Sequence, residues 1–179
     1  MTVYVALLRG LNVGGHNKLK MDALRAIAEG CGFGHVQTYI QSGNVVFSSR
    51  AGAAKVSSQL HDAILAESGI DSRVVVRTAA EIDGVLRDNP FLDRATVPKT
   101  LHVAFLYDEA VPTFDAVAPA SYAPDEVVLG ARDAYLLTPD GVGRSKLATE
   151  SMMRKLGFQG TVRNWATVTT LAEMAAAMR

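Results

Sequence analysis

The sequence predicts an α+β protein with a ferredoxin-like N-terminal lobe and a second, related α+β lobe. Short β-branched runs and amphipathic segments follow one another in the order β-α-β-β-α-β over residues 1–78. A similar pattern partly recurs over residues 79–179. With 179 residues and 49% apolar content, the chain is long enough for one large core or two small lobes packed as a compact unit.

The elements of the first lobe follow from apolar spacing and from the residues that stop it. We expect a first helix from about residue 21 to Gly30 and a second from about residue 56 to Gly69, because the apolar residues recur at helical spacing up to each glycine. The turn-forming sequence QSG separates two of the strands. The expected strands are residues 3–8, 35–40, 44–48 and 73–77.

The second lobe begins with a helix, since Thr78 and Glu81 fit a capping box and Pro90 stops the helix near residue 88. A linker to residue 98 follows. We expect strands at 101–107, 127–129, 134–137 and 161–163, and helices near Phe114, at 145–156 and through Met178. GFGHVQTY (32–39) resembles GFQGTVRNW (157–165), which indicates either an internal repeat or the common helix-glycine-strand pattern.

Charge is distributed unevenly, although the formal net charge is zero. Residues 1–61 carry +4, residues 62–140 carry −8 and residues 141–179 carry +4. Both basic ends contain the unusual polar motifs, so we expect these ends to converge. No run is long enough for a membrane span, and no basic region precedes the first apolar stretch as in a signal peptide. The single cysteine suits a reducing, cytoplasmic location.

The segment VYVALLRGLNVGGHNKLK (3–20) places a glycine-rich, cationic loop directly after the first strand. Gly10 and Gly15 have the spacing of a phosphate-binding loop, but His16 and Asn17 stand where that loop needs lysine and serine or threonine. Backbone N–H groups at the start of the next helix, with lysines close by, still favour an anion. The alternative is a glycine turn with solvated lysines.

Three further segments concentrate polar side chains. TYIQSGN (38–44) fits either a binding turn or ordinary hairpin chemistry. In GVGRSKL (141–147), Ser145 is the expected N-cap, and the cations beside it oppose the helix dipole, so we expect a bound anion or an acidic neighbour. RNWATVTT (163–170) precedes or opens the last helix, where Thr170 and Glu173 fit a capping box.

Recognised metal and catalytic motifs are absent from the sequence. The four histidines lack the spacing of metal ligands. We expect Cys31 to be a packed thiol rather than a nucleophile. The polar motifs contain no carboxylate, so any chemistry would depend on positioning, on cations, on His16 or on an activated hydroxyl. Catalysis, cofactor and oligomeric state stay open, and no metal is expected.

The motifs ALLRGLNVGGHNKLKM, TYIQSGNVVF, GRSKL and RNWATVT, in this order, resemble the bacterial domain-of-unknown-function 1697 family over essentially the whole chain. The resemblance implies a compact cytosolic α/β protein without an established activity. The family pattern has asparagine after the tryptophan, where this chain has Ala166, so a ligand contact by that amide would be lost. The polar positions of the family correspond here to Arg9, Asn12, Asn17, Lys18, Lys20, Tyr39, Gln41, Ser42, Asn44, Ser145, Lys146, Arg163 and Asn164.

These observations support three functional hypotheses. The first is a cytosolic protein that binds a small phosphate- or carboxylate-bearing ligand in a cleft formed by the basic N- and C-terminal motifs. The second is a nucleic-acid-binding module, because an RNA-recognition motif has the same element order, although SGNVVF offers only Phe47 for base stacking. The third is a non-catalytic regulatory or interaction protein, whose acidic middle would contact the basic ends of another copy.

Overall fold

A computed structural model describes residues 1–94, 97–108, 113 and 117–179 of the chain. The chain forms two compact units, and each is described by itself below. Unit 1 comprises Met1–Gly84 and Thr170–Arg179, and unit 2 comprises Val85–Thr169. The divisions fall within two helices, α3 (Ala79–Arg87) and α5 (Trp165–Ala176), whereas the sequence places a single boundary after residue 78.

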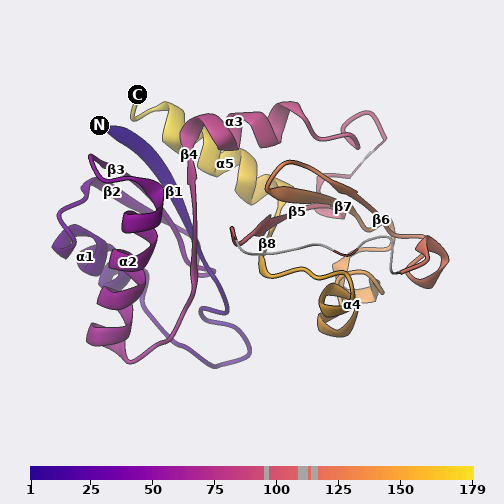
Figure 1. Ribbon diagram of the computed structural model, residues 1–179, viewed down its shortest axis with the longest axis horizontal. Helices are drawn as coiled ribbons and strands as arrows, with labels where there is room; N and C mark the ends of the chain where they lie inside the picture. Colours follow the sequence, from indigo (N-terminus) through magenta and orange to yellow (C-terminus); the bar gives the residue numbers. More distant parts are fainter. Residues whose placement is uncertain (95–96, 109–112, 114–116) are drawn as a thin grey trace. The chain divides into compact units, whose positions relative to one another are not determined.

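Unit 1 contains a four-stranded antiparallel sheet with the order β2-β3-β1-β4. Its strands are β1 (Thr2–Leu8), β2 (Gly34–Tyr39), β3 (Asn44–Ser49) and β4 (Val74–Thr78). The helices α1 (Met21–Gly30) and α2 (Ala53–Ser68) lie on one face of the sheet (Figure 1). The predicted ferredoxin-like β-α-β-β-α-β order is therefore confirmed for this unit.

The core of unit 1 follows the helical and strand periodicities of the sequence. Every third or fourth residue of each helix is buried, and alternate residues of the strands face these positions. Phe33 stacks on Phe47 of β3 with a centroid distance of 4.4 Å. The α2 helix ends at Gly69, as expected, because its φ of 72° lies in the left-handed region that glycine adopts without strain.

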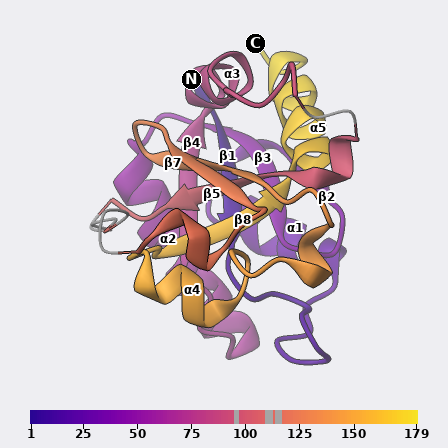
Figure 2. The same ribbon diagram turned by 90° about the vertical axis from the view of Figure 1, so that its right-hand side faces the viewer.

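Unit 2 contains a second antiparallel sheet, with the order β6-β7-β5-β8. Its strands are β5 (Leu101–Leu106), β6 (Glu126–Leu129), β7 (Asp133–Leu137) and β8 (Gly160–Asn164). The short helix α4 (Glu150–Lys155) lies beside this sheet (Figure 2). Its Met152 and Met153 pack against the core that contains Ala104 and Leu136. The strand order equals that of unit 1 with four added to each number, so the two sheets share one topology.

The two sheets also share backbone hydrogen bonds at equivalent places. Leu8 N donates to Gly43 O at 2.9 Å in unit 1, and Leu106 N donates to Arg132 O at 3.1 Å in unit 2. The next residue bonds in both cases to the segment before the fourth strand. This correspondence aligns VYVALL (3–8) with LHVAFL (101–106). The sequence match of residues 32–39 with 157–165 is therefore wrong, because it pairs β2 with β8, whose counterpart is β4.

Two predicted helix starts are wrong, and one is confirmed. The expected helix at 145–156 is only the six-residue α4, capped by Thr149, whose Oγ1 accepts from Met152 N. Thr170 lies inside α5, which begins at Trp165, so it caps nothing. The Thr78–Glu81 capping box is present, since Thr78 N and Oγ1 donate to Glu81 and Glu81 N donates to Thr78 Oγ1. The helix expected near Phe114 lies outside the described residues.

No helix in the described part of the chain is both long enough and apolar enough to span a membrane.

Candidate functional site

Two of the four polar motifs meet at one end of the sheet of unit 1. In the antiparallel pair of β1 and β3, Leu7 lies opposite Asn44. The loop after β1 and the turn before β3 therefore lie at the same end of the sheet. Ser72, just before β4, adds a third segment, since its Oγ donates to Arg9 O in the loop after β1 at 2.8 Å. We call residues 9–20, 40–43 and 71–73 the loop cluster.

The side-chain amide of Asn12 holds the loop cluster together. Its Nδ2 donates to Leu19 O at 2.9 Å and to Gln41 O at 2.7 Å, while its Oδ1 accepts from Leu19 N at 2.9 Å. Its φ of 54° lies in the left-handed region, which asparagine tolerates better than most residues. The position therefore needs asparagine for the loop conformation itself.

Gly43 allows the turn to approach the loop closely. Its φ is 79°, and a Cβ atom there would come within 2.9 Å of the side chains of Leu8 and Leu11. Asn44 is fully buried beside it, and its Nδ2 donates to Tyr39 O and to Ser42 Oγ. These hydrogen bonds fix the backbone conformation of TYIQSGN (38–44), whether or not a ligand is bound.

Cationic side chains project from this rigid frame. Arg9, Lys18 and Lys20 are exposed, and none of the three forms an ion pair with an acidic side chain in the part of the chain that the structure describes. Asn17 supports the loop, since its Nδ2 donates to Gly10 O at 3.1 Å. Gln41 is exposed too, whereas Tyr39 and Ser42 are half-buried. The loop cluster thus carries three exposed cationic side chains on a backbone that is held by hydrogen bonds.

The GRSKL motif lies in unit 2 and has a different local structure. Ser145 is buried, donates to Asp125 Oδ2 at 2.9 Å and accepts from Ala148 N at 2.8 Å. Leu147 N donates to the same carboxylate oxygen at 3.2 Å. Asp125 is thus the acidic neighbour that the sequence analysis left open as an alternative to a bound anion. Lys146 remains exposed.

Arg163 and Asn164 also lie in unit 2, at the end of β8. Arg163 is 7% exposed, and its guanidinium donates through Nη1 to Thr161 Oγ1 at 2.7 Å and to Val162 O at 3.0 Å. Burial lowers the pKa of Arg163 to about 10, and Tyr107 acts in the opposite direction. Asn164 caps α5, since its Oδ1 accepts from Thr167 N at 2.8 Å. The hydrogen bonds of Arg163 and of Asn164 therefore support the fold of unit 2.

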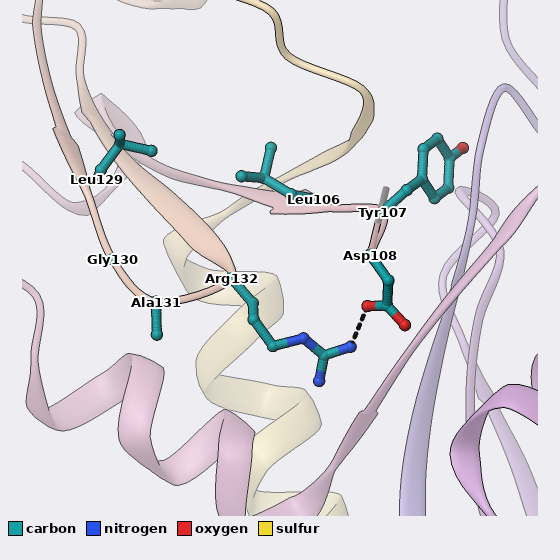
Figure 3. A pocket seen from close by; sticks show the side chains of 7 residues that line it. All are labelled: Leu106, Tyr107, Asp108, Leu129, Gly130, Ala131 and Arg132. Carbon is teal, nitrogen blue, oxygen red and sulfur yellow. Dashed lines mark hydrogen bonds and ion pairs between the residues drawn. The ribbon is translucent and has the colours of Figure 1, made fainter. Parts of the chain in front are cut away.

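Unit 2 has a cavity at the place that corresponds to the loop cluster of unit 1. The cavity has a volume of about 420 Å³ and lies between the end of β5 and the turn from β6 to β7. An ion pair of Arg132 with Asp108 joins the two segments, and Leu106, Leu129 and Ala131 add apolar surface (Figure 3). No motif of the sequence predicted this cavity, although the likeness of LHVAFL (101–106) to VYVALL (3–8) indicates an equivalent place in unit 2.

Metal binding finds no support in the geometry of the described residues, among which no group of three or more His, Cys, Asp or Glu side chains could hold an ion.

Comparison with known families decides the kinship of the chain. A family model described as a protein of unknown function (DUF1697) matches residues 1–135. The chain belongs to the DUF1697 family. No curated protein matches this sequence. The DUF1697 match contains the whole loop cluster and ends within β7, before GRSKL and RNWATVT.

A solved structure has the same fold. It is that of a conserved bacterial protein, SP0830, from Streptococcus pneumoniae, with a TM-score of 0.79 and 19% sequence identity. The alignment covers 98% of this DUF1697 chain and 99% of the other. The mixed α+β class predicted from the sequence is thereby confirmed. Ala166, which departs from the expected R-N-W-N pattern, lies exposed in the first turn of α5.

Proposed function

We propose that this DUF1697 protein binds a small phosphate- or carboxylate-bearing ligand through the loop cluster. One observation carries the proposal: Arg9, Lys18 and Lys20 are exposed on a backbone that is fixed by side-chain amides, and no acidic side chain among the described residues pairs with them. Charge-assisted hydrogen bonds from such groups to carboxylate or phosphate are about twice as strong as neutral ones.

The rigidity of the loop favours binding because a preorganised site loses less conformational entropy when the ligand arrives. Asn12 ties three backbone groups together, and Ser72 fixes the carbonyl of Arg9. The amides that the sequence analysis assigned to ligand contact thus support binding indirectly. The charged side chains remain as the groups that touch the ligand.

The sequence-based hypothesis that Ser145, Lys146, Arg163 and Asn164 contact the same ligand stays a prediction for Lys146, because the other three side chains already make hydrogen bonds that support the fold. Lys146 and Asn164 are the exposed members of this group, but Asn164 Oδ1 already accepts from Thr167 N, so Lys146 is the candidate for direct contact. Its substitution tests the single-site idea without disturbing a buried hydrogen bond.

Recognition of RNA in the manner of an RNA-recognition motif is less well supported. That mode stacks bases on aromatic side chains of the sheet face that the helices leave open. Tyr4 and Phe47, the aromatic residues of β1 and β3, are buried in the core, and Phe47 stacks on Phe33. Among the described strands of unit 1, the half-buried Tyr39 of β2 is then the one Phe, Tyr or Trp side chain outside this core, and a single such ring is too few for the two or three bases that this mode stacks.

The test is a thermal-shift series with inorganic phosphate, nucleotides, sugar phosphates, carboxylates and short RNA. A ligand at about one hundred times its Kd adds about 2.7 kcal/mol to the free energy of unfolding. For a chain of this length the melting temperature then rises by about 5 to 10 °C. The variants are Lys18→Ala with Lys20→Ala, and Lys146→Ala. The matched control is Lys99→Ala, an exposed lysine of unit 2.

We expect the double variant to lose the shift while its stability without ligand, and the shift of the control, stay unchanged. Loss of the shift in Lys146→Ala as well supports one site for both motifs. A ligand-induced shift that survives in the double variant would overturn the assignment to the loop cluster. The absence of any shift across the whole panel counts against small-anion binding.

A further inference from the structure

A cationic cavity lies at the end of the unit 1 sheet opposite to the loop cluster. It has a volume of about 450 Å³ and opens where β3 ends and α2 begins. The loop cluster adjoins the other end of β3, and a six-residue strand separates its ends by roughly 17 Å. The lining of the cavity includes Cys31, Ser48, Ser49, Arg50, Lys55 and Gln59.

The lining of this cavity has an excess of positive charge. Arg50 and Lys55 are both exposed, and the lining contains no carboxylate. Neither cation forms an ion pair within the described part of the chain, and the first turn of α2 has no acidic residue. Two positive charges therefore face the same volume without a protein counter-charge.

A buried hydroxyl adds a neutral donor to these cations. Ser49 is 8% exposed, and its Oγ accepts from Ala51 N at 3.1 Å. Among the described residues its hydroxyl hydrogen has no acceptor, so it is left to donate. Because Ser49 lines the cavity, its hydroxyl can donate to a ligand oxygen there. Ser48 differs, since its hydroxyl donates to Gly34 O at 3.2 Å.

The remaining wall is fixed and uncharged. Gln59 Nε2 donates to Cys31 O at 2.8 Å, which ties the end of α1 to the middle of α2. Burial and, secondarily, the Glu67 carboxylate raise the pKa of the Cys31 thiol above its usual value. The thiol is therefore neutral at pH 7 and does not repel an anion.

We propose that this cavity binds the dianionic phosphate group of a small phosphate monoester. Two cations match the charge of about −1.5 to −2 that such a group carries at pH 7. The guanidinium of Arg50, the ammonium of Lys55 and the hydroxyl of Ser49 supply donors for its oxygens. The volume lies within the range of about 300 to 1,000 Å³ that is typical of small-molecule sites. The site is independent of the loop cluster.

Cys31, the single cysteine of the chain, lines the cavity and reports on its occupancy. The experiment measures the rate of Cys31 alkylation by iodoacetamide with inorganic phosphate, glycerol 3-phosphate, sodium acetate or sodium chloride at matched ionic strength. At a concentration of about three times Kd, a quarter of the protein is free, so alkylation slows about fourfold. We expect both phosphate compounds to protect, and acetate and chloride not to.

Variants locate the effect. Arg50→Gln with Lys55→Gln should lose the protection, Ser49→Ala should weaken it, and Lys18→Gln with Lys20→Gln in the loop cluster should retain it. Melting curves confirm that each variant is folded. Equal protection by acetate overturns the dianion assignment, and equal protection by chloride shows an ionic-strength effect alone. Protection that persists in the Arg50 and Lys55 double variant, or protection by neither phosphate compound, overturns the site itself.

Discussion

Arg77 and Arg163 occupy the same position in the two sheets. Arg77 lies opposite Val5 in the pairing of β1 with β4, and Arg163 lies opposite Val103 in the pairing of β5 with β8. Each guanidinium donates through Nη1 to the carbonyl of the preceding residue, at 3.1 and 3.0 Å. Both side chains are buried. A buried charged side chain at equivalent positions indicates a shared structural role for the two arginines.

The charge of Arg163 should matter less to stability than its volume. Burial lowers its pKa to about 10, which means that desolvation opposes the charged form. Replacement of a buried charge by an apolar side chain of similar length is often nearly neutral. We expect Arg163→Met to stay within about 1 kcal/mol of the wild type, whereas Arg163→Ala, which leaves a cavity, should cost about 2 to 4 kcal/mol. Urea denaturation measures both, and equal losses would contradict this account.

Gly43 should be far less replaceable than another glycine of the loop cluster. In Gly43→Ala the new methyl group meets Leu8 and Leu11, and the residue must also keep a φ of 79°. We expect a loss of about 2 to 4 kcal/mol. Gly15→Ala is the matched control, since its φ is 81° but its surroundings are open, and it should cost only about 1 kcal/mol. Similar losses in chemical denaturation would show that strain, not the close approach, decides.

Ser145 should contribute to stability rather than to ligand affinity. Its hydroxyl donates to the buried carboxylate of Asp125, which keeps one bond from Leu147 N when Ser145 is removed. Loss of one partner of a buried polar group costs about 1 to 3 kcal/mol, and we expect this for Ser145→Ala. Lys146→Ala, an exposed neighbour, should change stability by less than about 0.5 kcal/mol. A fully stable Ser145→Ala variant would return Ser145 to the list of ligand contacts.

His102 should make the protein less stable as the pH falls. Its Nδ1 is buried without a hydrogen-bond partner among the described residues. Burial lowers the pKa of His102, and an interaction with the Thr100 backbone raises this pKa by a smaller amount. Since the folded pKa lies below the unfolded value of 6.5, the unfolded chain binds more protons below that pH. The contribution of His102 is thus present above pH 6.5 and lost as the pH falls through the folded pKa.

The measurement compares urea denaturation at pH 7.5 and pH 5.5. Wild type should lose more stability between these two values than His102→Leu, in which this titration is absent. An unchanged pH dependence in His102→Leu would show that other groups cause the acid sensitivity.

Local patterns predicted most of the elements because their signals are local. The glycine at residue 69 ends α2, and Thr78 with Glu81 starts α3, as the sequence indicates. The helix expected from residue 145 failed for a non-local reason. Asp125, twenty residues earlier in the chain, holds Ser145 and Leu147 in a turn, so the helix begins at residue 150.

By itself the sequence determined the α+β class, the strand order along the chain and the kinship with one family, because apolar periodicity, caps and motif order are properties of contiguous residues. Only the tertiary structure showed that Asn12 and Asn44 build the loop cluster, that Arg163 is buried, and that Cys31 lines a cavity with Arg50 and Lys55. The sequence does not distinguish a polar side chain that bonds to a distant carbonyl from one that contacts a ligand. The choice depends on which backbone groups the fold brings within hydrogen-bond distance.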